Sequence, residues 1–104
     1  MKRGDVWWAR LPSPAKTRPV VLVSRPEGIA HRQLVTVALV TTRKRTIRSE
    51  TELGASEGLP RPSVANCDDL RTISKRWLLE QIGTLGSSKL ADLDDALRFA
   101  LGLE

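Results

Sequence analysis

The sequence has few of the side chains on which many protein chemistries depend. It contains one cysteine, Cys67, one histidine, His31, and no tyrosine. A single cysteine cannot form an internal disulfide. One cysteine and one histidine also fall short of the roughly three or four ligands that a zinc site takes. With no nucleotide-binding loop either, we expect a fold without disulfides and a protein that uses no metal or other cofactor.

Long apolar runs are absent as well. No stretch approaches the roughly 18 apolar residues that a membrane-spanning helix needs, and residues 1–5 lack the apolar segment of a signal peptide. We therefore expect a cytoplasmic protein with no membrane partner. The chain of 104 residues predicts a single domain over residues 1–104. Its core should be modest, so help from a second subunit is expected.

The charges are unevenly distributed along the chain. Residues 1–48 hold 11 Lys and Arg against two acids, a net charge of +9, and residues 49–104 hold 6 against ten, a net charge of −4; together they give the overall +5. A basic half of this kind is typical of a surface that binds a polyanion such as a nucleic acid. The alternative is a soluble protein with uneven surface charge, and charge alone does not decide between them.

Short apolar and β-branched runs predict a mainly β fold. Strands are expected at residues 4–9, 19–24, 34–42, 49–53, 63–67, 70–73 and 78–83. The segment 70–73 could instead be a turn leading into a brief helix. Residues 10–17 and 25–33 are predicted to be loops because they contain prolines and polar residues. Adjacent Trp7 and Trp8 should face opposite sides of their strand, one in the core and the other at an interface or stacked on a base.

One helix is predicted, at the C-terminus. Its apolar residues recur at spacings of three and four: Leu90, Leu93, Leu97, Ala100 and Leu101. Ser87 or Ser88 is expected to cap its start and Gly102 to end it. Several short strands followed by one helix predict a small, strongly curved barrel or partly open sheet with the helix packed on it.

Several motifs, in this order and spacing, resemble the MazF/PemK (Kid) toxins. They are Arg3-Gly4-Asp5-Val6-Trp7, Thr17-Arg18-Pro19-Val20, the strand ending at Thr41, Pro62-Ser63-Val64, Cys67-Asp68, Arg71-Thr72-Ile73 and Gln81-Ile82-Gly83-Thr84-Leu85. The resemblance implies an SH3-like barrel with a C-terminal α-helix, the fold shared with CcdB. It also implies a homodimeric endoribonuclease toxin of a type II toxin–antitoxin system, whose partner is a MazE-like antitoxin with an acidic, flexible tail.

The resemblance implies three catalytic residues, Arg18, Thr41 and Asp68. Pro19 holds Arg18 in extended backbone. Without the resemblance, Arg18 would be interpreted as an arginine paired with a carboxylate at a barrel edge, and Thr41 as a residue that suits a strand. The residues expected to contact RNA are Lys16, Thr17, Thr42, Arg43, Lys44, Arg45 and Asn66. The alternative for the basic run is a solvated loop, and the alternative for His31 is an exposed loop residue with no role in acid–base chemistry.

Two features depart from the family pattern. Asn66 stands where the Kid branch has an arginine, and the loop before Arg18 is short. The mechanism implied is cleavage of single-stranded RNA without a metal ion, through a 2′,3′-cyclic phosphate. Arg18 would stabilise the phosphorane, Thr41 would position it, and Asp68 would act as base. The target could be mRNA, tRNA or rRNA. The competing functions are a CcdB-like gyrase poison and a non-catalytic nucleic-acid-binding module of SH3-like shape.

Overall fold

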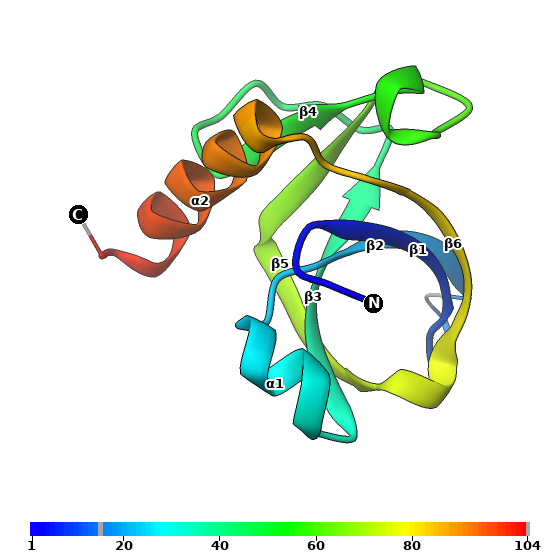
Figure 1. Cartoon of the computed structure of the whole chain (residues 1–104). Helices are drawn as coiled ribbons and strands as arrows, with labels where there is room; N and C mark the ends of the chain where they lie inside the picture. Colours follow the sequence, from blue (N-terminus) through cyan, green and yellow to red (C-terminus); the bar gives the residue numbers. More distant parts are fainter. Residues whose placement is uncertain (15, 104) are drawn as a thin grey trace.

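The protein is a six-stranded antiparallel sheet that curls round on itself and carries a helix on one side (Figure 1). The structure, a computed structural model, describes residues 1–14 and 16–103. The strands, in the order in which they lie in the sheet, are β4 (Glu50–Leu53), β5 (Ser63–Ser74), β3 (Leu34–Thr41), β2 (Thr17–Leu22), β1 (Asp5–Arg10) and β6 (Leu78–Thr84). The helical elements are α1 (Pro26–His31), η1 (Ala55–Glu57), η2 (Lys75–Trp77) and α2 (Ser87–Leu101).

The two faces of the sheet each bury an apolar cluster. One cluster joins Val21 and Val40 of the sheet to Leu93 of α2. The other contains Val20 and Leu39 from the same two strands. Side chains alternate between the faces of a strand, so β2 and β3 supply both clusters. The second strand is therefore covered on both sides, which explains its near-continuous apolar sequence.

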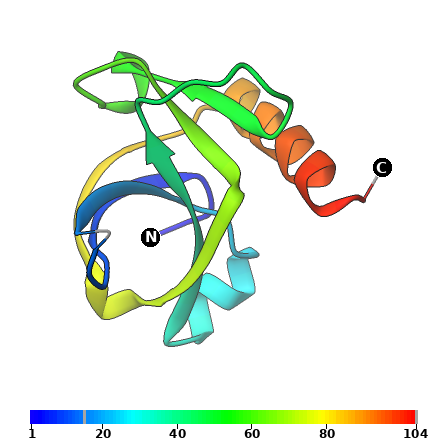
Figure 2. The ribbon, with the colours of Figure 1, turned by 180° about the vertical axis from the view of Figure 1, so that it is seen from behind.

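The terminal helix packs outside the curl of the sheet. Seen from both sides, α2 lies against β4 and the adjoining end of β5 (Figures 1 and 2). Leu90, Leu93, Leu97 and Ala100 of the predicted apolar stripe pack on the core, whereas Leu101 is 56% exposed. Gly102 ends the helix with a left-handed φ of 69°. The predicted serine cap is wrong, because the N-cap is Gly86 and no side chain caps the helix start. No helix in the described part of the chain is long and apolar enough to cross a membrane.

Two elements differ from the sequence-based expectation. The predicted strands 63–67 and 70–73 are parts of one strand, β5, which pairs with both β4 and β3. The connection 25–33 contains a helix, α1, which begins at Pro26. Proline suits the first position of a helix because the N–H it lacks would have no partner there. With only six residues and one buried apolar side chain, Ile29, α1 has no recognisable periodicity.

Close backbone contact joins η1 to β6. Gly58 has a φ of +84°, and a Cβ added to it would lie 2.5 Å from the carbonyl oxygen of Ile82. A Cβ added to Gly83 would collide with the carbonyl oxygen of Glu57. These two glycines therefore let the chain after β4 pack directly on the last strand. The fold as a whole confirms the predicted mainly β, SH3-like class with a C-terminal helix.

Candidate active site

The start of β2 and the end of β3 come together at one end of the sheet. Val20 pairs with Leu39 in an antiparallel register, which places Arg18 beside Thr41 when it is continued to the strand ends. On the other side of β3, Leu39 pairs with Asn66 of β5. A groove of about 320 Å³ lies here, which we call the Arg18 groove. Its lining residues are Arg18, Leu39, Thr41, Arg43, Arg45, Asn66 and Asp69.

The backbone around Arg18 is well held, although its side chain is exposed. Arg18 pairs with Ala9 of β1, and Pro19 pairs with Trp8. Pro19 also restricts Arg18 to extended backbone. The loop before it turns back on itself, because the N–H of Leu11 donates to the carbonyl of Lys16 over 2.8 Å. The guanidinium of Arg18 is thus carried by rigid strand rather than by loop.

The basic segment after β3, residues 42–49, is shaped by an acid at the start of the next strand. The carboxylate of Glu50 accepts hydrogen bonds from the backbone N–H groups of Arg45 and Thr46, both at 3.0 Å, and its side chain is only 2 % exposed. The Arg45 guanidinium also lies 3.5 Å from this carboxylate. At the other end of the loop, the Thr41 hydroxyl accepts from the N–H of Arg43 over 3.1 Å. Arg43 and Arg45 are thereby turned to the groove by backbone bonds.

Lys44, between them, is directed elsewhere. Its ammonium group lies 2.9 Å from the carboxylate of Glu52 on β4. The hydrogen bond and the positive charge of Lys44 lower the pKa of Glu52. Lys44 therefore does not line the Arg18 groove, in contrast to its two neighbours.

Opposite β3, strand β5 contains an arch of three residues: Cys67, Asp68 and Asp69. Asn66 pairs with Leu39 and Leu70 pairs with Ala38, so the three residues between them have no partner on β3. The strand changes direction at this point, as Figure 2 shows. Extra residues of this kind bend a strand and redirect its side chains, and they are frequent beside active sites.

The arch gives the two aspartates different surroundings. Asp68 accepts a hydrogen bond of 2.5 Å from the hydroxyl of Ser49, a residue only 1 % exposed. Asp69 lines the Arg18 groove, and its carboxylate also pairs with Arg71 at 3.2 Å. Asp68, the aspartate chosen from the sequence, is thus directed to Ser49, and its neighbour supplies the carboxylate of the groove.

Cys67 is buried, as expected of a small strand residue. Burial, and to a lesser extent the negative charge of Asp68, raise the pKa of its thiol to about 11. The thiol is therefore protonated at neutral pH, which disfavours a role as nucleophile.

The structure brings together about half of the residues selected from the sequence. Arg18, Thr41, Arg43, Arg45 and Asn66 share the Arg18 groove. The selected residues outside it are Asp68, Lys16, Thr17, Thr42 and Lys44. His31 is exposed at the end of α1. Over residues 1–14 and 16–103, no group of three or more His, Cys, Asp or Glu side chains is arranged to hold a metal ion.

Asp69 and Leu39 also line the groove, and neither was predicted from the sequence. Asp69 could have been considered because it follows Asp68 directly. The arch that turns the two side chains in different directions, however, has no recognisable pattern in the sequence. The strand pattern predicts Leu39 to be an ordinary core residue, and its side chain is only 4% exposed.

Comparison with known proteins identifies the family. The PemK-like, MazF-like toxins of type II toxin–antitoxin systems match residues 2–101. The chain belongs to this toxin family. The resemblance found in the sequence is thereby confirmed.

Individual relatives of this MazF-like toxin agree with the family match. Endoribonuclease MazF3 of Mycobacterium tuberculosis is 38% identical over 89 residues, which cover 86% of each protein. The solved structure of the Mycobacterium tuberculosis toxin MazF-mt6 superimposes with a TM-score of 0.88 at 36% identity, covering 96% of this chain and 98% of that one. A mycobacterial endoribonuclease solved in complex with its cognate antitoxin gives a TM-score of 0.89 at 29% identity, covering 100% and 97%.

Proposed function

We propose that this MazF-like toxin is an endoribonuclease that binds the scissile phosphate of single-stranded RNA in the Arg18 groove. The observation that supports this most directly is that Arg18 and Thr41 lie side by side where β2 begins and β3 ends, next to Arg43 and Arg45. Three guanidinium groups around one concave site suit a phosphate, since arginine donates paired hydrogen bonds to phosphate oxygens. Relatives with a similar sequence and the same fold are named endoribonucleases.

The proposed reaction uses the RNA's own 2′-hydroxyl as nucleophile. Its oxygen forms a bond to the adjacent phosphorus while the bond from phosphorus to the 5′-oxygen breaks. The products are a 2′,3′-cyclic phosphate and a 5′-hydroxyl end. Arg18 stabilises the additional negative charge on the phosphorane and remains charged throughout. No step requires a metal ion.

Two protons have to be moved in this reaction. A base accepts the proton of the 2′-hydroxyl, and the departing 5′-oxygen takes up a proton from an acid or from water. The resemblance assigned the base to Asp68, whereas Asp69 is the carboxylate that lines the Arg18 groove. We assign proton acceptance to Asp69 and a supporting role in the arch to Asp68, which Ser49 holds. Thr41 and Asn66 supply polar groups that position the phosphate and ribose.

The partner proposed for the toxin is an antitoxin of MazE type that acts in the cytoplasm. A related endoribonuclease was solved with its cognate antitoxin. An acidic, flexible tail lying along the Arg18 groove would occupy the same guanidinium groups as RNA and so block cleavage.

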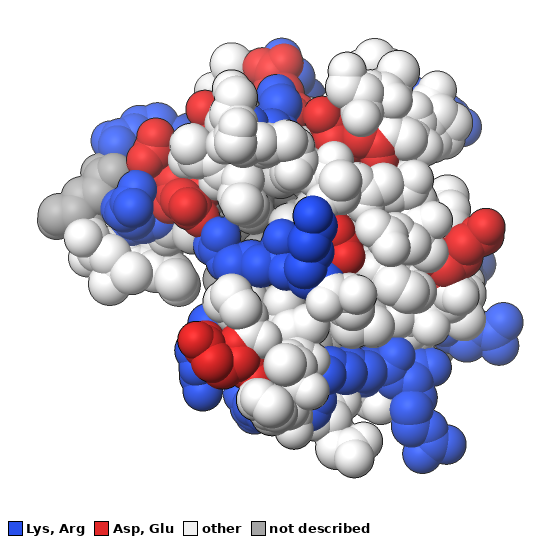
Figure 3. Space-filling model, viewed as in Figure 1, with Lys and Arg blue, Asp and Glu red and all other residues white. Residues whose placement is uncertain are grey.

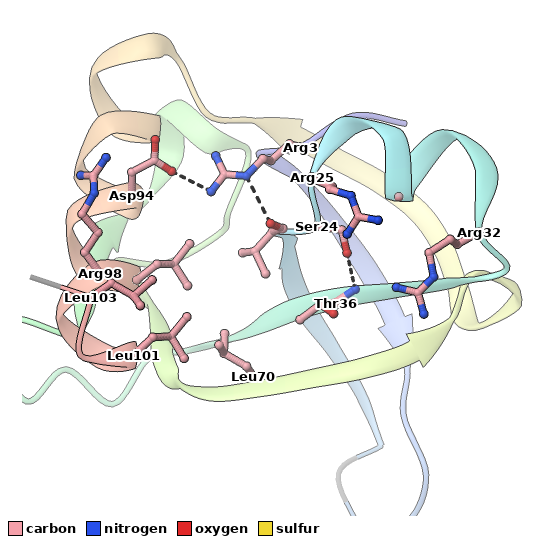
Figure 4. A pocket seen from close by; sticks show the side chains of 13 residues that line it. Arg3, Ser24, Arg25, Arg32, Thr36, Leu70, Asp94, Arg98, Leu101 and Leu103 are labelled. Carbon is pink, nitrogen blue, oxygen red and sulfur yellow. Dashed lines mark hydrogen bonds and ion pairs between the residues drawn. The ribbon is translucent and has the colours of Figure 1, made fainter.

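A homodimer is the proposed assembly. The last turn of α2 and the residues after it leave large apolar side chains in water: Phe99 is 43% exposed, Leu101 56% and Leu103, beyond the helix, 69%. Leu101 and Leu103, with Leu70, form one side of a pocket of about 450 Å³, while Arg25 and Arg32 lie across from them near α1 (Figure 4). Apolar area gathered in this way is typical of a protein–protein contact surface.

The proposed function is tested with purified protein, a long single-stranded RNA and EDTA. We expect the wild type to release fragments with 5′-hydroxyl ends, and Arg18→Ala to cut at least about 100-fold more slowly, because a donor to the developing charge is lost. Arg76→Ala, which replaces an exposed arginine of η2, is the matched control and should cut normally. Circular dichroism confirms that each variant is folded.

Wild-type rates for Arg18→Ala would contradict the assignment. The absence of cleavage by every protein, over several RNAs of different sequence, would contradict the nuclease itself. If binding that weakens with salt remained in that case, the non-catalytic module would be the better interpretation.

A further inference from the structure

A second pocket, of about 270 Å³, adjoins the Arg18 groove and shares one residue with it, Thr41. Its apolar lining includes Trp8, Pro19, Val40 and Leu59, and we call it the Trp8 pocket. The proposed function gives this pocket no role.

The two pockets open on opposite faces of the same strands. Leu39, in the Arg18 groove, belongs to one apolar cluster, and Val40, in the Trp8 pocket, belongs to the cluster under α2. Arg18 and Pro19 are likewise consecutive, so their side chains leave β2 on opposite faces. Thr41, at the end of β3, therefore forms a rim between the cationic Arg18 groove and the apolar Trp8 pocket.

The lining of the Trp8 pocket suits a flat, partly polar ring. Trp8 is half-buried and stands directly opposite Pro19 in the sheet, while Leu59 beneath them is 4% exposed. At the mouth, Thr42 supplies a hydroxyl and Arg61 the pocket's charged side chain. The hydroxyl of Ser63 donates to the carbonyl of Arg61 over 2.9 Å, which fixes the turn that presents this arginine.

We propose that the Trp8 pocket binds the base of a nucleotide next to the scissile phosphate. This rests on the proposed function, in which the phosphate occupies the Arg18 groove on the other side of Thr41. An RNA strand that crosses this rim places a phosphate among arginines and the neighbouring base against an aromatic ring. Bases stack on aromatic side chains without regard to sequence, and donors at the mouth then select among them.

The first experiment compares cleavage preferences. Random single-stranded RNA is cut by the wild type and by Trp8→Ala and Arg61→Ala, and the fragment ends are sequenced. We expect both variants still to cut, but to lose about tenfold of the wild-type base preference at one position beside the cut, as expected for a lost stacking or hydrogen-bonding contact. Trp8→Phe should largely keep the preference. Trp77→Ala and Arg76→Ala, at the exposed η2, are the matched controls and should leave the profile unchanged.

An unchanged profile in both pocket variants would overturn the proposal. Should Trp8→Ala fail to fold, Arg61→Ala decides alone, since its side chain is exposed and its loss leaves the core intact.

The second experiment locates the base without relying on cleavage. Random RNA that contains 4-thiouridine and 2′-O-methyl groups, and so cannot be cut, is photo-crosslinked to the wild type. Crosslinks on Trp8 or residues 59–63 support the proposal, and crosslinks confined to other segments overturn it. If the wild type cuts no RNA, the crosslinks still show whether the pocket binds a base. In that case the proposed nuclease activity is contradicted, and the proposed base site is judged separately.

Discussion

Two neighbouring aspartates show how far the chemistry of a residue depends on the direction of its side chain. Asp68 and Asp69 are identical in type and adjacent in sequence. The arch in β5 turns one toward Ser49 and the other toward the Arg18 groove. Under the proposed mechanism only Asp69 meets the RNA, so only Asp69 can take a proton from it.

We expect Asp69→Asn to lower kcat by about 100-fold or more, because a positioned general base commonly contributes a factor of this size. Asp68→Asn is the matched control and should lower kcat by about tenfold at most, since it alters the support of the arch only. Single-turnover cleavage assays with saturating protein measure both effects on the chemical step. The reverse order of the two effects would return the role of base to Asp68.

At this scale the sequence predicted what depends on the course of the strands. The resemblance selected Arg18 and Thr41, each at the end of a recognisable strand, and the register of β2 and β3 shows that they lie side by side. Arg43 and Arg45 followed from their position after Thr41. The separation of Lys44 from its neighbours was not predictable, because it depends on the ion pair between this segment and Glu52 of β4.

Among the elements, the contact between η1 and β6 controls how the segment after β4 packs on the last strand. A methyl group at Gly83 would collide with the carbonyl oxygen of Glu57, which is backbone and cannot rotate away. Gly86, at the start of α2, has nothing within 4 Å of the position that its Cβ would take. The two positions therefore form a matched pair for the same substitution.

We expect Gly83→Ala to lower the free energy of unfolding by about 1–3 kcal/mol, the usual cost of forcing extra volume into a packed site. Gly86→Ala should change it by less than about 0.5 kcal/mol. Urea titrations followed by tryptophan fluorescence measure both values. Equal stabilities for the two variants would show that η1 can move away from β6 without cost.

The elements that the sequence did not predict depend on contacts between residues that are far apart in the sequence. The single strand β5 was divided in two because the polar residues of the arch interrupt its pattern, and only the pairing with β3 and β4 shows that it continues. Helix α1 forms over too few residues to show a period, and the packing of Ile29 into the core holds it in place.

For the whole molecule, ion pairs join side chains from the basic N-terminal half of the sequence to the acidic C-terminal half. Around α2, acidic and basic side chains lie close together on the face shown in Figure 3. Arg3, from the basic half, pairs with Asp94 of α2 at 2.7 Å, and Arg98 pairs with Asp95 at 2.8 Å. Part of the positive charge counted along the sequence is thus used within the fold, which composition alone could not reveal.

The proposed homodimer gives a prediction at the same scale. We expect Leu101→Glu to produce a monomer, because it places a charge within the exposed apolar end of α2. Leu79→Glu is the matched control, since Leu79 is 50% exposed on β6, away from this surface, and should leave the dimer intact. Analytical ultracentrifugation over a range of concentrations measures the mass. A monomeric wild type, or a dimer of Leu101→Glu, would contradict the proposed assembly.

The outer strand of the sheet, β6, has a consequence for solubility. Its pairing with β1 shifts register twice, its central residues Glu80 and Gln81 are exposed, and η1 packs against its end. A strand with these irregularities is a poor template for edge-to-edge growth of sheets between molecules. Under the proposed function, the toxin acts when its antitoxin is gone and has to stay dispersed without that partner. We expect the uneven outer strand to favour this, because it offers neighbouring molecules no regular edge to pair with.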